Sequence, residues 1–251
     1  MELYTYRREL QRDLPGTLKI IHDLGTTNVE GSVFQGKSAA ETRALLDTAG
    51  LRCTSMGASY DKMQHDIDGV IADAKTLGAK YVILAWIPHK GDFTEAEAHQ
   101  AAKDFNTWGQ KLSSQGLKFA YHPHGYEFVH TKTATLVDLL IQETSPEFVT
   151  FELDTFWFRQ AGADPARYLE KYPTRFQLMH LKDIAPGTAE NFTGGAPEPS
   201  SVVLGRGELH WPEILRAASH SAITEYFIED ESVDAPAQVP QTLEYLKQIR
   251  F

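Results

Sequence analysis

Four short apolar runs of the sequence each end in side chains that can bind a metal ion or move a proton. The runs end in Tyr121-His-Pro-His, Phe151-Glu-Leu-Asp, Leu178-Met-His-Leu-Lys and Phe227-Ile-Glu-Asp-Glu. If the runs are parallel strands of a barrel, their carboxyl ends meet at one edge, so we expect these side chains to lie close together. Two imidazoles and two carboxylates form a mixed nitrogen and oxygen set that suits Mn, Co, Fe, Zn or Mg. The sequence therefore predicts one divalent metal ion per chain. Its predicted ligands are His122, Asp154, His180 and Glu229.

Each of these residues also has a simpler interpretation. A single histidine at a strand end is usually only a hydrogen-bonding side chain, and it is the register of all four residues that favours a metal. Asp154 ends an apolar strand and needs a positive partner, which is either a metal ion or Lys182. Glu152 lies two residues earlier and so on the same strand face as Asp154, and its role is open, with a structural salt bridge as the alternative. Cys53 is the only cysteine, which excludes an intrachain disulfide and a multi-cysteine metal site.

Repeated βα units are expected to position these side chains, because short β-rich runs alternate with longer amphipathic segments. Apolar residues at Leu14, Leu18, Ile21 and Leu24 predict one face of a helix, and Ser38-Ala-Ala-Glu is a capping box that starts the next helix. About eight such units predict an α/β fold, a (β/α)8 TIM barrel that forms a single domain over residues 1–251. The predicted strands are Leu3–Tyr6, Asn28–Gly31, Leu51–Met56, Tyr81–Trp86, Lys118–His122, Phe148–Asp154, Phe176–Lys182 and Tyr226–Glu229.

One segment, Ile184–Arg206, departs from this alternation. It is rich in glycine and proline and is too long for a bare connection in a compact domain. It directly follows the strand predicted to end at Lys182. Because long loops at this edge of a barrel are commonly functional, we predict a loop that covers the four ligands.

The charge and the hydropathy pattern limit the partners of the chain. A formal net charge of −10 without a cluster of Lys and Arg disfavours nucleic acid, which needs a basic surface. No run approaches the roughly 18 apolar residues of a membrane span, so no membrane partner is expected. The first residues lack the basic and then apolar pattern of a secretory signal. A cytoplasmic location is expected, with an export signal already removed as the alternative, and the oligomeric state is left open.

Several motifs together resemble one enzyme family. They are Tyr121-His-Pro-His-Gly-Tyr-Glu-Phe, Glu152-Leu-Asp-Thr-Phe-Trp, Ala161-Gly-Ala-Asp-Pro, His180-Leu-Lys-Asp, Leu204-Gly-Arg-Gly-Glu-Leu-His-Trp and Ile228-Glu-Asp-Glu. They are similar to the xylose-isomerase-like TIM-barrel family of sugar phosphate isomerases and epimerases. The resemblance implies a (β/α)8 barrel with one divalent metal held by Glu, Asp, His and Glu. Asp154, His180 and Glu229 fit the last three, whereas His122 or His124 falls where the first Glu would be.

The resemblance implies a sugar or sugar phosphate isomerase or epimerase that removes a proton next to a carbonyl through a metal-stabilised enediolate. The small-molecule partner is then a carbohydrate. Relatives move the proton with two glutamates, so Glu229 is one candidate base, and Glu127, His122 or His124 replaces the other. Lys182 is a candidate for polarising the carbonyl or binding a phosphate, with an ordinary ion pair as the alternative. A lyase or hydratase acting on 3-keto-sugars or 3-keto-glycosides, and a non-catalytic sugar-binding barrel, are the competing functions. A metal-dependent abasic endonuclease is disfavoured by the acidic charge.

Overall fold

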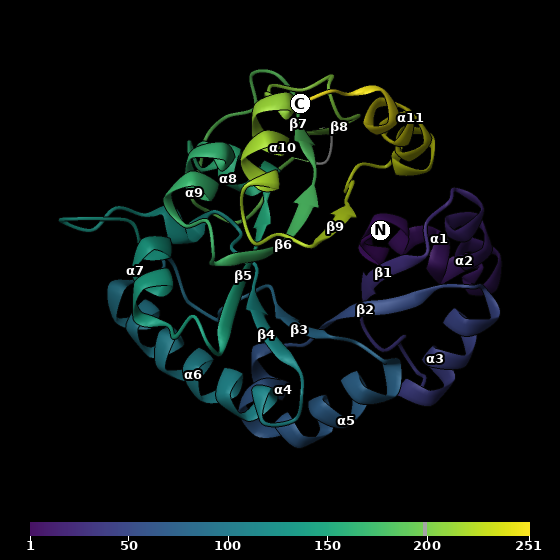
Figure 1. Ribbon diagram of the computed structural model, residues 1–251, viewed down its shortest axis with the longest axis horizontal. Helices are drawn as coiled ribbons and strands as arrows, with labels where there is room; N and C mark the ends of the chain where they lie inside the picture. The colour runs from purple at the N-terminus through teal and green to yellow at the C-terminus, as the bar shows by residue number, and fades with distance from the viewer. Residues whose placement is uncertain (198–199) are drawn as a thin grey trace.

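Seven parallel strands form one curved sheet with helices on its outer side (Figure 1). The computed structural model describes residues 1–197 and 200–251. The strands follow one another around the sheet in the order β1-β2-β3-β4-β5-β6-β9. Their bounds are Asn28–Gly31 for β1, Arg52–Gly57 for β2, Tyr81–Leu84 for β3, Lys118–Tyr121 for β4, Val149–Asp154 for β5, Phe176–Leu181 for β6 and Glu225–Ile228 for β9.

The first two residues fill the remaining gap between β9 and β1. The backbone N–H of Glu2 donates to Ile228 O at 3.0 Å, and the N–H of Glu30 donates to Met1 O at 3.0 Å. Glu2 and Glu30 form an isolated parallel bridge. Figure 1 accordingly places the amino terminus between β9 and β1. The sheet is therefore a nearly closed barrel, and the predicted TIM-barrel architecture is confirmed.

The predicted first strand, Leu3–Tyr6, is wrong, because these residues form the 3₁₀-helix η1. The Glu2 side chain accepts a hydrogen bond from the Tyr4 N–H at 3.0 Å, so the chain turns immediately after its one bridging residue. A period of three residues then buries Leu3 and Tyr6 on the same side. The other seven predicted strands agree with the structure to within two residues at each end.

The helices follow the apolar periodicity of the sequence. In α2 the predicted face is confirmed, since Leu18 and Ile21 are fully buried. The predicted capping box is present at Ser38, whose hydroxyl accepts from the N–H of Glu41. None of the helices within the described ranges combines the length and the apolar character needed to cross a membrane. The helices are α1 Arg7–Arg12, α2 Leu14–Asp23, α3 Ala39–Thr48, α4 Tyr60–His65, α5 Ile67–Leu77, α6 Glu95–Ser113, η2 Tyr126–Phe128, α7 Leu136–Glu143, α8 Thr155–Gln160, α9 Pro165–Lys171, α10 Trp211–Ser219 and α11 Ala235–Gln248.

The strands present an apolar layer and then a polar layer to the barrel interior. Tyr81, Ile83, Ala120, Leu178 and Phe227 form a separate buried cluster. Because side chains alternate along a strand, the residue two positions further on points to the same interior. For three of these strands the next inward residue is polar, and these residues are His122, His180 and Glu229. The apolar layer thus forms a packed floor beneath a buried polar layer.

The predicted loop Ile184–Arg206 contains regular structure that the sequence did not reveal. Strand β7, Asp183–Ile184, pairs antiparallel with β8, Ser201–Val202. This short two-stranded ladder satisfies backbone groups within the predicted loop. Residues 198 and 199 of this segment lie outside the described residues.

Candidate metal centre

The four predicted ligands lie together in the polar layer, at the carboxyl ends of neighbouring strands. His122 directly follows β4, Asp154 is the last residue of β5, His180 lies in β6 and Glu229 directly follows β9. Each of the four residues is at most 7% exposed. Strand pairing sets their spacing, because Asp154 is in register with His180. The sheet therefore brings the predicted ligands to one place.

The donor atoms of this group face one another at short range. His180 Nδ1 lies 3.0 Å from Glu229 Oε2 and 3.6 Å from Asp154 Oδ2. His122 Nε2 lies 3.8 Å from the same Asp154 oxygen. Nitrogen and oxygen donors bound at about 2.0–2.2 Å to one tetrahedral ion are roughly 3.4 Å apart. Asp154, His180 and Glu229 have donor atoms close enough together for one shared ion, and His122 Nε2 approaches this group at Asp154.

Two buried atoms of the group have no hydrogen-bond partner within the described part of the chain. They are His122 Nε2 and Asp154 Oδ2. The other oxygen of Asp154 accepts from the backbone N–H groups of Phe156 and Trp157 at 2.8 and 2.9 Å, which caps helix α8. A buried polar atom without a partner is costly, and a metal ion would satisfy both atoms at once. The donor set therefore fits a divalent cation.

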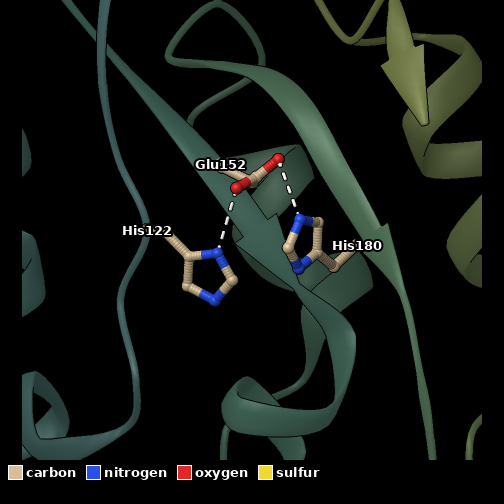
Figure 2. A group of neighbouring side chains, drawn as sticks. All are labelled: His122, Glu152 and His180. Atoms are coloured by element: carbon tan, nitrogen blue, oxygen red, sulfur yellow. Dashed lines mark hydrogen bonds and ion pairs between the residues drawn. The ribbon is translucent and has the colours of Figure 1, made fainter. Parts of the chain in front are cut away.

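Glu152 lies between the two histidines (Figure 2). Its Oε2 accepts a hydrogen bond from His122 Nδ1 at 3.0 Å, and its Oε1 lies 3.3 Å from His180 Nε2. Glu30 Oε1 lies 2.9 Å from the same His180 nitrogen. His122, Glu152 and His180 are also close enough to hold an ion themselves. That second position is less suitable, because His122 Nδ1 and Glu152 Oε2 already satisfy each other.

The electrostatics of the group favour a bound cation. Burial and the neighbouring His180 lower the pKa of His122 to about 4, so its imidazole is neutral near pH 7 and keeps a lone pair for a metal. Burial alone would lower the pKa of His180, but attraction to Glu152 and Glu229 raises it well above its usual value. Burial and repulsion from Glu30 raise the pKa of Glu152. Several carboxylates thus share one buried space with the ammonium group of Lys182.

Lys182 is held by two carboxylates. Its ammonium group lies 3.3 Å from Glu229 Oε2 and donates a further hydrogen bond to Glu231 Oε1. It also lies over the rings of Phe156 and Trp157, 5.0 and 4.7 Å from their centroids. Burial would lower the pKa of Lys182, but Glu229 and Glu231 outweigh that effect and raise it. Of the two roles considered for Lys182, this geometry corresponds to the ion pair.

His124 and Glu127 occupy different places in the loop after β4. The half-buried ring of His124 stacks on His122 with centroids 4.5 Å apart, and it lies 5.2 Å from the ring of Trp157. Its Nε2 has no hydrogen-bond partner among the residues described. Glu127 is fully buried, hydrogen-bonded to the Tyr121 hydroxyl and to the backbone N–H of His124 at 3.1 Å. His124 therefore faces the group, whereas Glu127 supports the loop from behind.

The loop after β7 reaches across the barrel mouth. The Asn191 N–H donates to Gln160 O at 3.0 Å, and Arg159 forms an ion pair with Glu190 at 2.7 Å, so α8 anchors the loop. Gly194 has a φ of +68°, and a Cβ atom there would lie 2.9 Å from side-chain atoms of Trp86 and Tyr126. The described part of the loop thus extends from α8 to the end of β3. Trp86 remains 42% exposed beside it.

The sequence did not predict two members of this arrangement, Glu30 and Glu231, which carry carboxylates into the group. Strand alternation placed Glu152 on the same face as Asp154 but left its role open. Glu30 lies in β1, 150 residues before His180, and nothing local to its sequence signals that contact.

Comparisons with known proteins agree with this architecture. The model of the xylose isomerase-like TIM barrel family matches residues 18–249. The chain belongs to this family. In sequence it is 26% identical over 180 residues to inosose dehydratase 2 of a Bacillus cereus strain, an alignment that covers 68% of this chain and 60% of the relative. It is 27% identical over 139 residues to inosose dehydratase of Mesomycoplasma hyopneumoniae (strain 7448), covering 51% and 46%. The chain thus spans 46–60% of the length of these two relatives.

Solved structures show the same fold in other proteins. A sugar phosphate isomerase/epimerase from Parabacteroides distasonis ATCC 8503 superposes with a TM-score of 0.82 at 24% identity, over 99% of this chain and 97% of that one. An IOLI protein with a bound zinc atom superposes with a TM-score of 0.74 at 14% identity, over 99% and 94%. At these identities the likeness shows the fold alone.

Proposed function

We propose that this protein is a divalent-metal-dependent dehydratase that removes a proton next to the carbonyl of a keto-polyol or keto-sugar and expels a neighbouring hydroxyl group. The observation that carries the proposal is the pair of buried, unpartnered atoms His122 Nε2 and Asp154 Oδ2 within the described residues, facing His180 Nδ1 and Glu229. The two relatives named inosose dehydratase support it, because an inosose is a cyclic keto-polyol.

The four ligands of the proposed ion are His122, Asp154, His180 and Glu229. When bound, a divalent ion supplies Lewis acidity toward a carbonyl oxygen and so makes the neighbouring C–H group more acidic. Around it, the chain's own residues exclude water and hold the substrate. Trp86, which is 42% exposed, is an aromatic surface at the mouth that suits the apolar face of a polyol ring.

His124 is the residue that we assign to proton transfer. The Nδ1 of His124 lies 3.3 Å from the carbonyl oxygen of His122, which can only accept, so the neutral ring carries its proton on Nδ1 and its lone pair on Nε2. Its Nε2 has no partner in the described residues, whereas Glu229 and Lys182 are engaged with each other. The C–H electron pair then forms the new double bond as the C–O bond breaks. His124 can return the same proton to the departing hydroxyl, which leaves as water, so elimination requires no second acid.

Isomerisation or epimerisation is the second candidate, in which the proton returns to carbon. One observation favours it: Glu229 Oε1 accepts no hydrogen bond from the described residues, so it is available as a second proton carrier. A phosphorylated substrate is less well supported. Lys182, the cation nearest to the ligands, is already paired with Glu229 and Glu231.

The test is to load metal-free protein with Mn, Co, Zn or Mg and to incubate it with inososes and keto-sugars. Mass spectrometry should show metal-dependent loss of one water from a substrate. His124→Asn should slow that loss by about 100-fold or more, as removal of a general acid or base does. Metal-dependent formation of a product with unchanged mass would select the second candidate. No metal-dependent turnover with any of these compounds, or an unaffected His124→Asn protein, would contradict the proposal.

A further inference from the structure

The two histidine ligands each present two ring nitrogens, and only one nitrogen of each can face the proposed ion. His122 directs Nε2 toward Asp154 and Nδ1 toward Glu152. His180 directs Nδ1 toward Asp154 and Glu229, and Nε2 toward Glu30 and Glu152. A neutral imidazole carries one proton, so whichever nitrogen carries it is lost as a ligand. Something must therefore place both protons on the side away from the ion.

Glu152 is placed to do this for His122. It is fully buried, and its Oε2 is the one hydrogen-bond partner of His122 Nδ1 in the described residues. A cation bound beside the histidines favours the ionised form of Glu152, which only accepts hydrogen bonds, so the proton of His122 then lies on Nδ1 and the lone pair on Nε2. Figure 2 shows the carboxylate directly between the two rings.

Glu30 has the corresponding position for His180. Its Oε1 lies 2.9 Å from His180 Nε2, closer than Glu152 Oε1 at 3.3 Å. The two histidines differ in the number of carboxylates near the nitrogen that faces away from the proposed ion. His180 has two, Glu30 and Glu152, whereas His122 has only Glu152 among the described residues. Removal of Glu152 consequently leaves His122 without an acceptor, whereas His180 retains Glu30.

We propose that Glu152 is a positioning residue that fixes which nitrogen of His122 faces the metal, while Glu30 has the same role for His180. This inference rests on the metal site of the proposed function. Carboxylates that orient ligating histidines commonly change metal affinity by about 10–100-fold when they are removed. Here removal of Glu152 should affect His122 and removal of Glu30 should affect His180. A general effect on folding would not separate the two histidines in this way.

The variants are Glu152→Leu, which removes the acceptor, Glu152→Gln, which keeps a neutral acceptor of the same length, and Glu30→Gln. Asp138→Asn is the matched control, because Asp138 is a buried carboxylate that accepts from Lys171 and Tyr172 and contacts none of the four ligands. Zinc affinity, measured by competition with a chelating dye, should fall by about 100-fold in Glu152→Leu and about 10-fold in Glu152→Gln, and remain unchanged in Asp138→Asn.

The second readout is long-range ¹H–¹⁵N NMR of the histidine rings in the zinc-loaded protein. In the wild type, His122 should carry its proton on Nδ1 and His180 on Nε2. In Glu152→Leu the His122 pattern should be lost while that of His180 is kept, and Glu30→Gln should do the reverse. Because the wild-type measurement needs no variant, it decides the matter even if Glu152→Leu does not fold.

Wild-type protein that binds zinc with the His122 proton on Nε2 would overturn this inference and leave the metal site standing. Equal zinc affinity and unchanged ring patterns in Glu152→Leu would overturn it as well. Wild-type protein that binds no divalent ion would instead remove the proposed function, and the inference with it. Loss of both histidine patterns in every variant, including Asp138→Asn, would show a general effect on folding and would also contradict the assignment.

Discussion

Two buried aspartates near the carboxyl edge of the sheet, Asp183 and Asp154, differ in how their oxygens are satisfied. Asp183 accepts hydrogen bonds on both oxygens, and its donors are the N–H groups of Ile184, Gly205, Gly207 and Leu209 and the Trp211 indole. Asp154 is satisfied on Oδ1 only, and its Oδ2 has no partner in the described part of the chain. A carboxylate surrounded by donors holds structure together, whereas one left half satisfied in a buried site is available to a ligand.

Replacement of Asp154 should give the largest effect on function. Asp154→Asn keeps the size of the side chain but removes the charged oxygen that faces His122 and His180. Zinc affinity should fall by more than the roughly 100-fold loss that outer residues cause, and turnover should fall with it. The metal-free protein should remain folded, because the amide oxygen can still cap α8. Calorimetric titration measures the zinc affinity, and thermal unfolding shows whether the metal-free protein is folded. Unchanged zinc affinity would contradict the role of Asp154 as a metal ligand.

Asp183→Asn should show the opposite pattern. Its amide nitrogen would meet N–H groups where an oxygen now accepts them, which leaves buried donors unsatisfied. We expect a loss of about 2–4 kcal/mol in the free energy of unfolding. Zinc affinity of the folded fraction should stay within about twofold of the wild type, because Asp183 contacts none of the four ligands. Chemical denaturation of the metal-free protein checks the first value, and a stability equal to that of Asp154→Asn would contradict the distinction.

Glu127 offers an intermediate case, a buried carboxylate that is partnered but lies beside the proposed proton carrier. Burial raises the pKa of Glu127 to about 7, despite the hydrogen bond from Tyr121. A carboxyl group with a folded-state pKa above its unfolded value favours the folded protein when protonated. Its contribution is therefore fully present below about pH 4.5 and is lost as the pH rises through about 7. Unfolding free energies of the metal-free protein across pH 5–8 should show this loss, and Glu127→Gln should remove that part of the slope.

Replacement of Gly194 tests the role of the loop that begins beside Asp183 and reaches Trp86 at the barrel mouth. A side chain at Gly194 would meet both a positive φ and the rings of Trp86 and Tyr126. Gly194→Ala should lift this part of the loop at a cost of about 1 kcal/mol and reduce kcat/KM by roughly fivefold. The melting temperature should change by only a few degrees. Gly187→Ala, which has the same backbone strain at φ +77° but no neighbour within 4 Å of its Cβ, is the control.

Local patterns predicted most of the barrel because each βα unit carries its own signals. The capping box at Ser38 and the apolar face of α2 needed only neighbouring residues, and both are present. The segment Leu3–Tyr6 was predicted wrongly because its apolar spacing also suits a 3₁₀ turn, and the Glu2 contact that selects the turn lies outside any strand pattern. Strand β7 pairs with β8 through Asp183 and Val202, which lie far apart in the sequence, so no local pattern signals this ladder.

The candidate site was predictable to the extent that it follows strand order. His122, Asp154, His180 and Glu229 each stand at a strand end, so parallel topology alone places them at one edge. The sequence could not separate Lys182 as a substrate contact from Lys182 as an ion pair, because Glu231 reaches it only after the chain has turned beyond β9. Nor could it divide the roles of His124 and Glu127, which depend on the turn at Gly125, where φ is +98°.

The most direct test of the account is anomalous diffraction from crystals of the protein grown with zinc or manganese. We expect one strong anomalous peak per chain, about 2.0–2.3 Å from His122 Nε2, Asp154 Oδ2, His180 Nδ1 and Glu229 Oε2. A peak bounded instead by His122 Nδ1, Glu152 and His180 Nε2, or the lack of any peak at saturating metal, would contradict it.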